Sequence, residues 1–423
     1  MKLQIKTLSP IHIGSGEKYN GLSYLTNRGK VLLYDSTKFM ENITLKYSER
    51  FMQWIEERTA EIEWLEKQKR NERDEQKRKN INKLLKDAQK KLSIKEFIEN
   101  AIQDVTVKDK FNNNFSYYAE AKTQVYNNID IEAFIKQNNK PYIPGTEIKG
   151  AIRTAIAYYL LKKDIYWNWL KGELENFGRQ HREDLQRIAG QRGKLVNDIK
   201  KKLVEGVGKI EEKLQNKLLR ADGKDDAKYD LLKLLQIGDS ELKKPPQCLF
   251  VSDLKTLNIS RQFATFQELC KKGQTFTCEI RLENLEKNKA VVLDKLGFSE
   301  DQKKVVSNVK NILQCCHEFS NRLIDEELTY THYSNEIKDK LNVIKKENKP
   351  DSPVIRIGKN EGYMSLTMGL LVKDKDKTIY DNVLCHATKN TSYTGSFPKT
   401  RRVVNLGNND TDTCGWVKLT KID

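Results

Sequence analysis

A proline–glycine turn that leads straight into a helical pattern is the segment best suited to binding an anion. It reads Pro-Gly-Thr-Glu-Ile-Lys-Gly-Ala-Ile-Arg over residues 144–153, and apolar residues then repeat at helical spacing to residue 162. A helix N-terminus offers free backbone N–H groups and the positive end of the helix dipole, which together favour a phosphate. Lys149 and Arg153 are four residues apart and so share one helix face. We expect a phosphate site formed by Gly145, Thr146, Lys149, Gly150 and Arg153.

Two residues of this segment have a predicted structural role as well. Thr146 is expected to cap the helix. Gly150 lies inside the helix, where glycine is about 1 kcal/mol less favourable than alanine. Two interpretations of Gly150 are open, and they are compatible. Either a ligand approaches the backbone closely there, or the glycine only allows the helix to pack closely on a sheet.

Three further segments place glycines or cations beside predicted strands. The alternating pattern of residues 2–13 runs through His12 into Gly14-Ser15-Gly16, where a phosphate backbone could approach the main chain. Residues 358–363 form a glycine loop after a short strand, with a charge at Lys359 and a possible stacking surface at Tyr363. The last segment, residues 397–404, clusters three cations. The candidate contacts of these three segments are His12, Gly14, Ser15, Gly16, Gly358, Lys359, Gly362, Tyr363, Lys399, Arg401 and Arg402.

The charge balance favours a polyanionic partner. The 423 residues include 76 Lys and Arg and 59 Asp and Glu, which gives a net charge of +17. A positive excess spread along much of the chain is typical of proteins that bind nucleic acid, and less often of those that bind anionic membranes. A lysine-rich surface can also simply aid solubility.

Several classes of protein are disfavoured by the composition. The seven cysteines include no Cys-x-x-Cys pair, which argues against a disulfide framework and a zinc site. We therefore expect no metal, no cofactor and a reducing, cytoplasmic setting. No run of 18 apolar residues and no signal-peptide pattern is present, so no membrane partner is expected.

The periodicity predicts an α+β protein that two charged helical blocks interrupt. Strand patterns alternate with the predicted helices 146–162 and 301–326, a hairpin is expected around Asn27-Arg28-Gly29, and residues 111–128 are expected to form a loop. The charged blocks cover about 51–110 and 163–230. They are either solvated decoration or arms that touch RNA or a neighbouring subunit.

In this order along the chain, the segments resemble the RAMP superfamily of CRISPR proteins. Within that superfamily they are most similar to the fifth-subunit family of type III-A Csm effector complexes. The motifs that carry the resemblance are His12–Gly16, residues 144–153, Leu235-Gln236-Ile237-Gly238-Asp239-Ser240, the loop at 358–362 and Pro-Lys-Thr-Arg-Arg at 398–402. Asn360 stands where the family loop often has a third glycine, and asparagine tolerates a positive φ better than most residues. Asp35 does not match the loop that cuts target RNA in the backbone subunits.

The resemblance implies two ferredoxin-like (RRM-like) modules with large charged helical insertions. One module would cover 1–285, with the insertions at about 51–110 and 163–230, and the other 286–423, with the glycine loop. It also implies a non-catalytic subunit that binds the guide RNA, caps its 3′ end, and supports its maturation and complex assembly in antiviral defence. The implied partners are the guide RNA and the backbone RAMP subunit, with the small helical subunit and target RNA as further candidates.

Two other functions stay open. A metal-independent guide-processing endoribonuclease shares the fold and the glycine loop, and it would need His12, His317 or His386 near a second titrating group. None of these histidines has an evident partner in the sequence. A helical scaffold without RNA contact is the third possibility, and the net charge argues against it.

Overall fold

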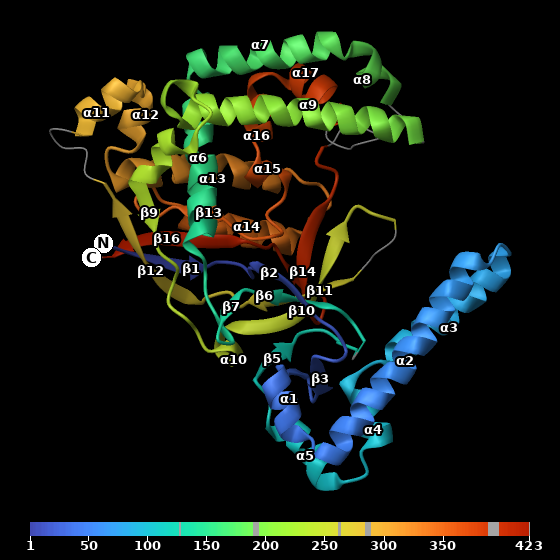
Figure 1. Cartoon of the computed structure of the whole chain (residues 1–423). Helices are drawn as coiled ribbons and strands as arrows, with labels where there is room; N and C mark the ends of the chain where they lie inside the picture. The colour runs from blue at the N-terminus through green and yellow to red at the C-terminus, as the bar shows by residue number, and fades with distance from the viewer. Residues whose placement is uncertain (127, 189–193, 261–263, 284–288, 388–396, 423) are drawn as a thin grey trace.

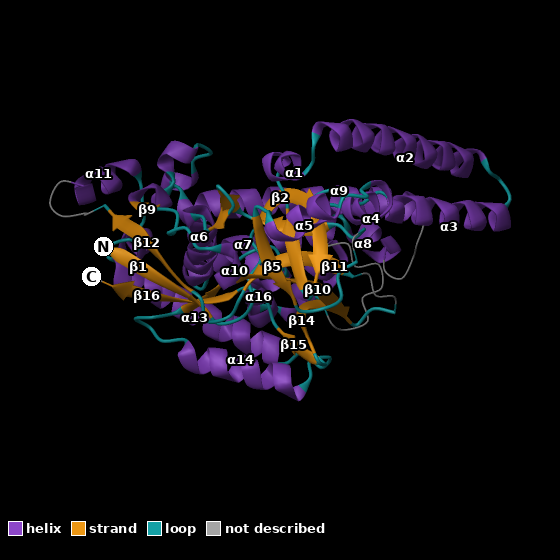
Figure 2. Ribbon diagram, turned by 90° about the horizontal axis from the view of Figure 1, so that it is seen from below, coloured by secondary structure: helices purple, strands orange, loops and turns teal. Residues whose placement is uncertain are grey.

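The protein has the mixed α+β architecture that the sequence predicts (Figures 1 and 2). The computed structural model describes residues 1–422 except 127, 189–193, 261–263, 284–288 and 388–396. Two large sheets form the body, and helices cover the first sheet. A helical hairpin projects away from this body.

The first sheet is antiparallel throughout and joins both ends of the chain. Its central strand pairs Lys2 with Ile422, so the termini lie side by side (Figure 1). Strands from residues 1–285 and from 286–423 pair within this sheet, so the two predicted units are interleaved. The strand order is β13 (Val354–Arg356), β16 (Trp416–Ile422), β1 (Lys2–Thr7), β12 (Thr275–Leu282) and β9 (Leu235–Ile237).

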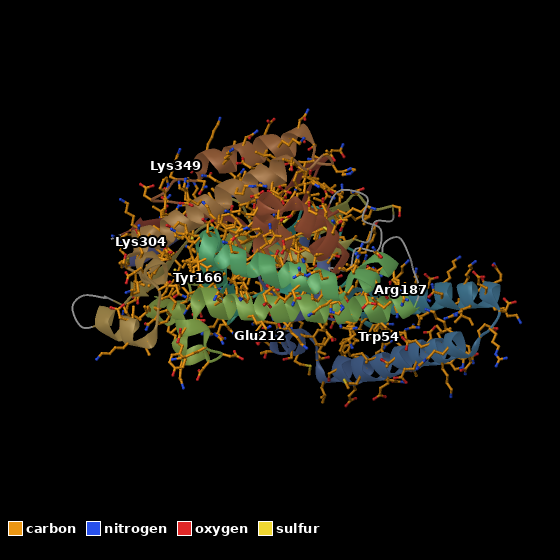
Figure 3. All side chains as sticks on the ribbon, turned by 90° about the horizontal axis from the view of Figure 1, so that it is seen from above. Trp54, Tyr166, Arg187, Glu212, Lys304 and Lys349 are labelled. Carbon is orange, nitrogen blue, oxygen red and sulfur yellow. The ribbon has the colours of Figure 1, made fainter. Side chains whose placement is uncertain are left out.

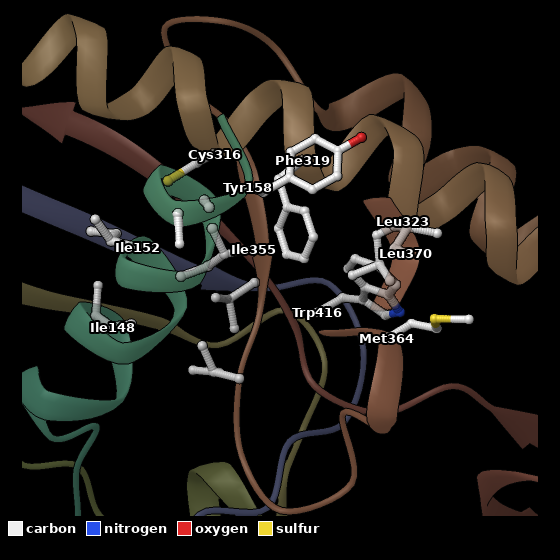
Figure 4. Close-up of a cluster of buried hydrophobic side chains, with 14 of the residues drawn as sticks. Ile148, Ile152, Tyr158, Cys316, Phe319, Leu323, Ile355, Met364, Leu370 and Trp416 are labelled. Carbon is white, nitrogen blue, oxygen red and sulfur yellow. The ribbon is translucent and has the colours of Figure 1, made fainter. Parts of the chain in front are cut away.

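Two long helices, α6 (Gly145–Leu161) and α13 (Val309–Leu328), pack together over this sheet. Figure 4 shows apolar side chains from both helices meeting those of Ile355 and Trp416 in the core. The rings of Tyr158 and Phe319 lie 5.1 Å apart where the helices touch. The prediction of α6 is confirmed to within a residue. The predicted helix 301–326 is divided, because Asn308 caps α13 and separates it from α12 (Glu300–Val305).

The second sheet has nine strands, and residues 8–13 connect it to β1. The predicted strand 2–13 therefore ends at Thr7, since its second half crosses from one sheet to the other. The expected hairpin is confirmed, but the expected loop 111–128 contains β5. The strands, in sheet order, are β2 (Gly14–Tyr19), β6 (Ile131–Phe134), β11 (Thr265–Cys270), β10 (Leu249–Leu257), β5 (Tyr117–Ala121), β4 (Lys30–Leu33) and β3 (Tyr24–Asn27), with β14 (Arg401–Gly407) beside β10 and β15 (Asp410–Asp412) beside β14.

The first charged block is helical, as predicted, and its central hairpin contacts the body mainly at its base, through Tyr47, Phe51 and Trp54. We call this hairpin, residues 45–91, the arm; Figures 1 and 2 show it projecting from the protein. Leu65, Leu85 and Ala88 form the small apolar seam between its two helices. The helices of the block are α1 (Ser36–Asn42), α2 (Leu45–Asn71), α3 (Glu75–Lys91), α4 (Ile94–Ala101) and α5 (Val105–Asn113).

The second charged block is part of the main core and is not solvated decoration. Its helices α7 (Asp164–Gln180) and α9 (Lys194–Leu219) lie side by side across the top of the molecule (Figures 1 and 3). Trp167, Leu170 and Leu214 are buried in the same apolar cluster as the first sheet. The helix α8 (Arg182–Ile188) connects the two.

Short helices complete the described chain. They are α10 (Pro245–Cys248), α11 (Lys289–Leu296), α14 (Asn335–Glu347), α15 (Tyr363–Leu366), α16 (Gly369–Lys375), α17 (Lys377–Ile379) and α18 (Cys385–Ala387), and β7 (Lys136–Gln137) and β8 (Lys140–Pro141) form a small separate hairpin. All seven cysteines are buried and unbridged. Within the described ranges, no cluster of three or more His, Cys, Asp or Glu could hold a metal ion. No helix of the described residues is long and apolar enough to cross a membrane.

Candidate nucleic-acid interface

The glycine loop lies directly against the His12 segment, so two of the predicted segments meet. The Lys359 backbone N–H donates to the His12 carbonyl oxygen at 2.9 Å. Gly358 has φ +88°, and a Cβ atom there would lie 2.4 Å from the same oxygen. Only glycine combines this conformation with this close approach. The loop therefore has a fixed position at the junction between the two sheets.

The basic segment 398–402 forms the other wall of a cleft beside this loop. The cleft has a volume of about 250 Å³, and we call it the glycine-loop cleft. Arg402 and Lys399 are exposed, and the Lys359 side chain is 49% exposed although its ammonium group pairs with Glu132 at 2.7 Å. The lining residues are Glu327, Arg356, Lys359, Asn360, Gly362, Tyr363, Met364, Pro398, Thr400, Arg401 and Arg402.

Asn360 joins the two walls through its side chain. It does not have the positive φ expected at this position of the loop. Its amide Nδ2 donates to Gln267 Oε1 at 2.8 Å, and its Oδ1 accepts from Arg402 Nη1 at 3.2 Å. A glycine could make neither bond. The departure from the family pattern thus ties the loop to β11 and β14.

Arg401 contributes to the core rather than to the open surface. Its guanidinium is buried, donates through Nε to Glu327 Oε1 at 2.8 Å, and lies 4.8 Å from the centre of the Tyr330 ring. The Tyr333 hydroxyl donates to the other oxygen of Glu327. Because its donors are used inside the protein, Arg401 does not fit the RNA-binding role predicted from the sequence.

Tyr363 is also partly committed to packing. Its ring meets the ring of Phe397 edge-on at 4.9 Å, and burial raises the pKa of its hydroxyl to about 12. Gly362 before it has φ +81° and is exposed at the start of α15. The loop therefore presents Gly362, with its main chain, to the solvent.

The N-terminus of α6 is capped by the chain itself, which revises the predicted phosphate site. The Gly145 N–H donates to Asp239 Oδ1 at 2.8 Å, and a Cβ at Gly145 would lie 2.1 Å from the Ile237 carbonyl oxygen. Pro144 is the N-cap residue, while the Thr146 side chain makes no capping bond. A negative carboxylate thus occupies the position expected for a phosphate.

The outer face of α6 remains a candidate for contact. A Cβ at Gly150 would meet no atom within 4 Å, so this glycine is not needed for packing on a sheet. Arg153 Nη1 pairs with Asp230 Oδ2 at 2.7 Å. Lys149 makes no ion pair with the described residues, and partial burial lowers its pKa. Lys149 and Gly150 are therefore the open part of the predicted site.

The carboxyl group of Glu147 connects α6 to the glycine loop, and that of Glu361 lies within the loop. Glu147 accepts a hydrogen bond from the Gly358 N–H, and burial raises the pKa of its carboxyl. Burial also raises the pKa of Glu361 to about 8, with Arg356 lowering it and Glu147 raising it further. The α6 segment, residues 144–153, therefore also meets the glycine loop.

The His12 side chain is enclosed, although its main chain holds the loop. The side chain is 0% exposed, Nδ1 lies 2.7 Å from the Glu268 carbonyl oxygen, and Nε2 lies 3.8 Å from Glu132 Oε2. Burial lowers its pKa. Gly14, Ser15 and Gly16 lie beside it on the exposed face of β2. Of the other two candidate histidines, His317 lies on α13 and bonds to Asn321, and the side chain of His386 is outside the described residues.

Residues 4–320 match the model of the RAMP superfamily. The chain belongs to the RAMP superfamily. This confirms the resemblance seen in the sequence motifs.

Two curated proteins are similar to this RAMP protein. The "CRISPR system Cms protein Csm5" of Methanocaldococcus jannaschii is 26% identical over 325 residues, which cover 72% of this chain and 67% of the relative. An uncharacterized protein of Aquifex aeolicus is 36% identical over 75 residues, or 18% of this chain and 30% of that protein.

Two solved structures share the fold. A chain in the cryo-EM structure of a type III-A Csm–crRNA–target RNA ternary complex superposes with a TM-score of 0.66 at 19% identity, covering 99% of this chain and 100% of that one. The crystal structure of T. onnurineus Csm5 gives 0.58 at 18% identity, with 98% and 99% covered. At this identity the likeness concerns the fold.

Sequence reasoning missed the acidic residues that organise the RAMP site. Asp239 lies in the recognised Gly-Asp-Ser motif, but it caps a helix that begins 94 residues earlier. Glu132 and Glu327 carried no sequence signal, because nothing local marks them as partners of Lys359 and Arg401. The positions of the cations can be read from the sequence, whereas the fold decides which of them are paired.

Proposed function

We propose that this RAMP protein is a non-catalytic, guide-RNA-binding subunit of a type III-A Csm complex. It would cap the 3′ end of the guide RNA and support guide maturation. The observation that carries the proposal is the glycine-loop cleft, in which Lys359 and Arg402 flank an exposed glycine main chain. The similarity to a protein named Csm5, and to a chain of a Csm–crRNA–target RNA complex, supports this assignment.

The proposed contact is with the phosphate backbone. Positive-φ glycines leave room for a backbone to approach the main chain, and the two cations supply charge-assisted hydrogen bonds. Such contacts fix the position of a strand and carry no base identity. Lys149 and Gly150, on the outer face of α6, are proposed as a second contact.

The order of the first sheet supports the ferredoxin-like interpretation. The sequence of β1, α6, β9, β12, α13 and β16 follows the β-α-β-β-α-β pattern, with strands ordered β9-β12-β1-β16. We therefore interpret this sheet and its two helices as one ferredoxin-like module. The second module stays a proposal from the family resemblance.

The enclosed His12 supports the non-catalytic assignment. A general base must reach the proton that it removes, within about 3 Å or through one water. The His12 imidazole is buried, and one of its nitrogens is used by the Glu268 main chain. An endoribonuclease that used His12 would need this ring to be exposed.

The first test is to purify the complex from cells with and without this chain and to sequence the guide RNA. We expect complexes whose guides have altered 3′ ends or lengths when the chain is absent. If precursor accumulates instead, and the purified chain cuts it without metal, the protein is a processing nuclease and the proposal is wrong.

The second test addresses the cleft. The Lys359→Gln/Arg402→Gln variant is compared with Lys310→Gln/Lys346→Gln, which removes two exposed lysines on α13 and α14. Each lost phosphate contact lowers the slope of log K against log salt by about 0.7 for a single strand, so the first variant should lose about 1.4 and the control about zero. Equal slopes would reject the cleft as the RNA site.

A further inference from the structure

One of the two helices of the arm carries a basic surface, and this surface is not part of the glycine-loop cleft. Its helix α3 has seven Lys and Arg side chains against two carboxylates, whereas its helix α2 has six of each sign. Solubility alone needs no such difference between two packed helices. The positive charge of the arm is therefore concentrated on α3.

Four lysines of α3 lie on one face of the helix. Lys79, Lys83, Lys86 and Lys90 are spaced by four, three and four residues, which places them in a line along an α-helix. We call them the lysine stripe. With a rise of 1.5 Å per residue, the stripe is about 16 Å long.

The packing of the arm leaves this face open. Ile81, Leu85 and Ala88 form the opposite side of α3 and pack on α2. All four stripe lysines are exposed. Because the arm projects from the body, as Figures 1 and 2 show, no other element of the described residues covers the stripe. The outer face of α3 is thus accessible to a partner that passes beside the body.

Two of the four stripe lysines make ion pairs, and both pairs are exposed to solvent. Lys79 pairs with Glu75 at 3.0 Å and Lys90 with Asp87 at 3.8 Å, and all of these side chains are more than half exposed. Pairs of this kind contribute little and are readily exchanged. Lys83 and Lys86 make no ion pair with any described residue. The two central lysines are therefore available to an anion.

We propose that the lysine stripe binds the phosphodiester backbone of a nucleic-acid strand, separately from the glycine-loop cleft. A line of compact, strongly hydrated ammonium groups fits a flexible row of phosphates without requiring fixed geometry. Its length would follow several nucleotides of one strand. Binding would be independent of sequence, because the stripe offers charge and no side chain that reads bases.

The test measures the salt dependence of RNA binding by the full-length chain. Fluorescence anisotropy with a 30-nucleotide oligouridine compares wild type with Lys83→Gln/Lys86→Gln. Glutamine keeps the helix propensity of lysine, so the arm should stay folded. The slope of log K against log salt should fall by about 1.4, and by about 2.8 when all four lysines are replaced. Circular dichroism checks that the helix content is unchanged.

The matched control removes the same charge from another face of the same helix. Lys77 and Lys91 are exposed and lie away from the stripe, so Lys77→Gln/Lys91→Gln should change the slope by much less than the stripe variant. Equal slopes for the stripe variant, the control and wild type would overturn the proposal. So would an unchanged slope combined with loss of the variant chain from the assembled complex, because the stripe would then contact an acidic protein surface.

Two further experiments identify the kind of nucleic acid that the stripe binds and distinguish the stripe from the glycine-loop cleft. The same assay with a 30-base-pair RNA duplex shows whether the stripe binds single strands or a guide–target duplex, and a fall in slope on either probe supports the proposal. Combining the stripe and cleft substitutions should give additive changes, since distant sites act independently. Loss of the stripe effect alone, with the cleft effect intact, would reject the stripe without touching the proposed function.

Discussion

Two glycines five residues apart in α6 should respond in opposite ways to the same substitution. Gly145→Ala would place a Cβ 2.1 Å from the carbonyl oxygen of Ile237 and 2.8 Å from that of Gly238. Both are backbone atoms, which no change of rotamer can move. Gly150→Ala would place its Cβ in open space. The pair therefore isolates the close packing at the helix start from the intrinsic preference of a helix for alanine.

The magnitudes follow from the two environments. Overpacking costs about 1–3 kcal/mol and sometimes more, and displacing Gly145 would also weaken its bond to Asp239, worth about 1.5–3 kcal/mol because the acceptor is charged. The gain of about 1 kcal/mol in helix propensity offsets part of this, so a net loss of about 3 kcal/mol is expected. Gly150→Ala should gain about 0.4–1 kcal/mol.

Thermal unfolding followed by circular dichroism measures both effects. An unfolding entropy of about 2.1 cal/mol/K per residue over 423 residues gives about 1 °C per kcal/mol. Gly150→Ala should therefore melt up to about 1 °C above wild type, and Gly145→Ala about 3 °C below it. A Gly145→Ala protein that melts like wild type would refute the close approach of Ile237. A Gly150→Ala protein that is clearly destabilised would refute the open position of Gly150.

Three other substitutions test separate parts of the structure. Arg401→Met should cost about 3 kcal/mol, because it removes the guanidinium that hydrogen-bonds the buried Glu327 carboxylate and leaves Arg356, at 3.7 Å, as its cation. Arg402→Met should leave the melting temperature unchanged and weaken RNA binding. Equal melting temperatures for the two variants would contradict the division between these neighbours. Burial raises the pKa of Glu361 to about 8. Between about pH 4.3 and pH 8 the folded state therefore holds a proton that the unfolded state has lost, so stability should fall as the pH rises through this range. Glu361→Gln should flatten melting temperature against pH over this range, and an unchanged curve would contradict the burial. Leu214→Ala should lower the free energy of unfolding, measured in urea, by about 2–5 kcal/mol. Leu84→Ala, on the exposed arm, should change it by less than about 0.5 kcal/mol. Similar losses for both variants would show that the second charged block is not part of the core.

Local patterns predicted several elements of the fold. The helix α6, the hairpin strands β3 and β4 and the short strand β13 before the glycine loop follow directly from periodicity and turn residues. The errors occur where contacts distant in sequence decide the structure. The strand β5 was expected to be a loop because its Asn- and Tyr-rich surroundings have no clear period, yet it pairs with β4 and β10.

The second charged block shows the same limit in its packing. Charged residues dominate its composition, but a narrow apolar stripe is enough to bury a helix when a neighbouring helix offers a matching surface. Trp167, Leu170 and Leu214 form such a stripe on α7 and α9. The arm has a similar composition, but only its base, at Tyr47, Phe51 and Trp54, packs against other described elements. Composition alone could not separate the two blocks.

The positions of the candidate contacts were predictable, but their availability was not. Whether a cation can bind RNA depends on how exposed it is and on which carboxylates hold it, and both depend on residues far away in the chain. Arg401 is buried against Glu327 and Arg153 is held by Asp230, whereas Lys359 stays 49% exposed beside Glu132. Arg402 is exposed, and among the described residues its side chain bonds to the neutral amide of Asn360. Neighbouring arginines in one motif thus have different roles. At the helix start, Asp239 already occupies the position where we expected a phosphate. The glycine loop is the better candidate, because its exposed main chain and flanking cations line an open cleft.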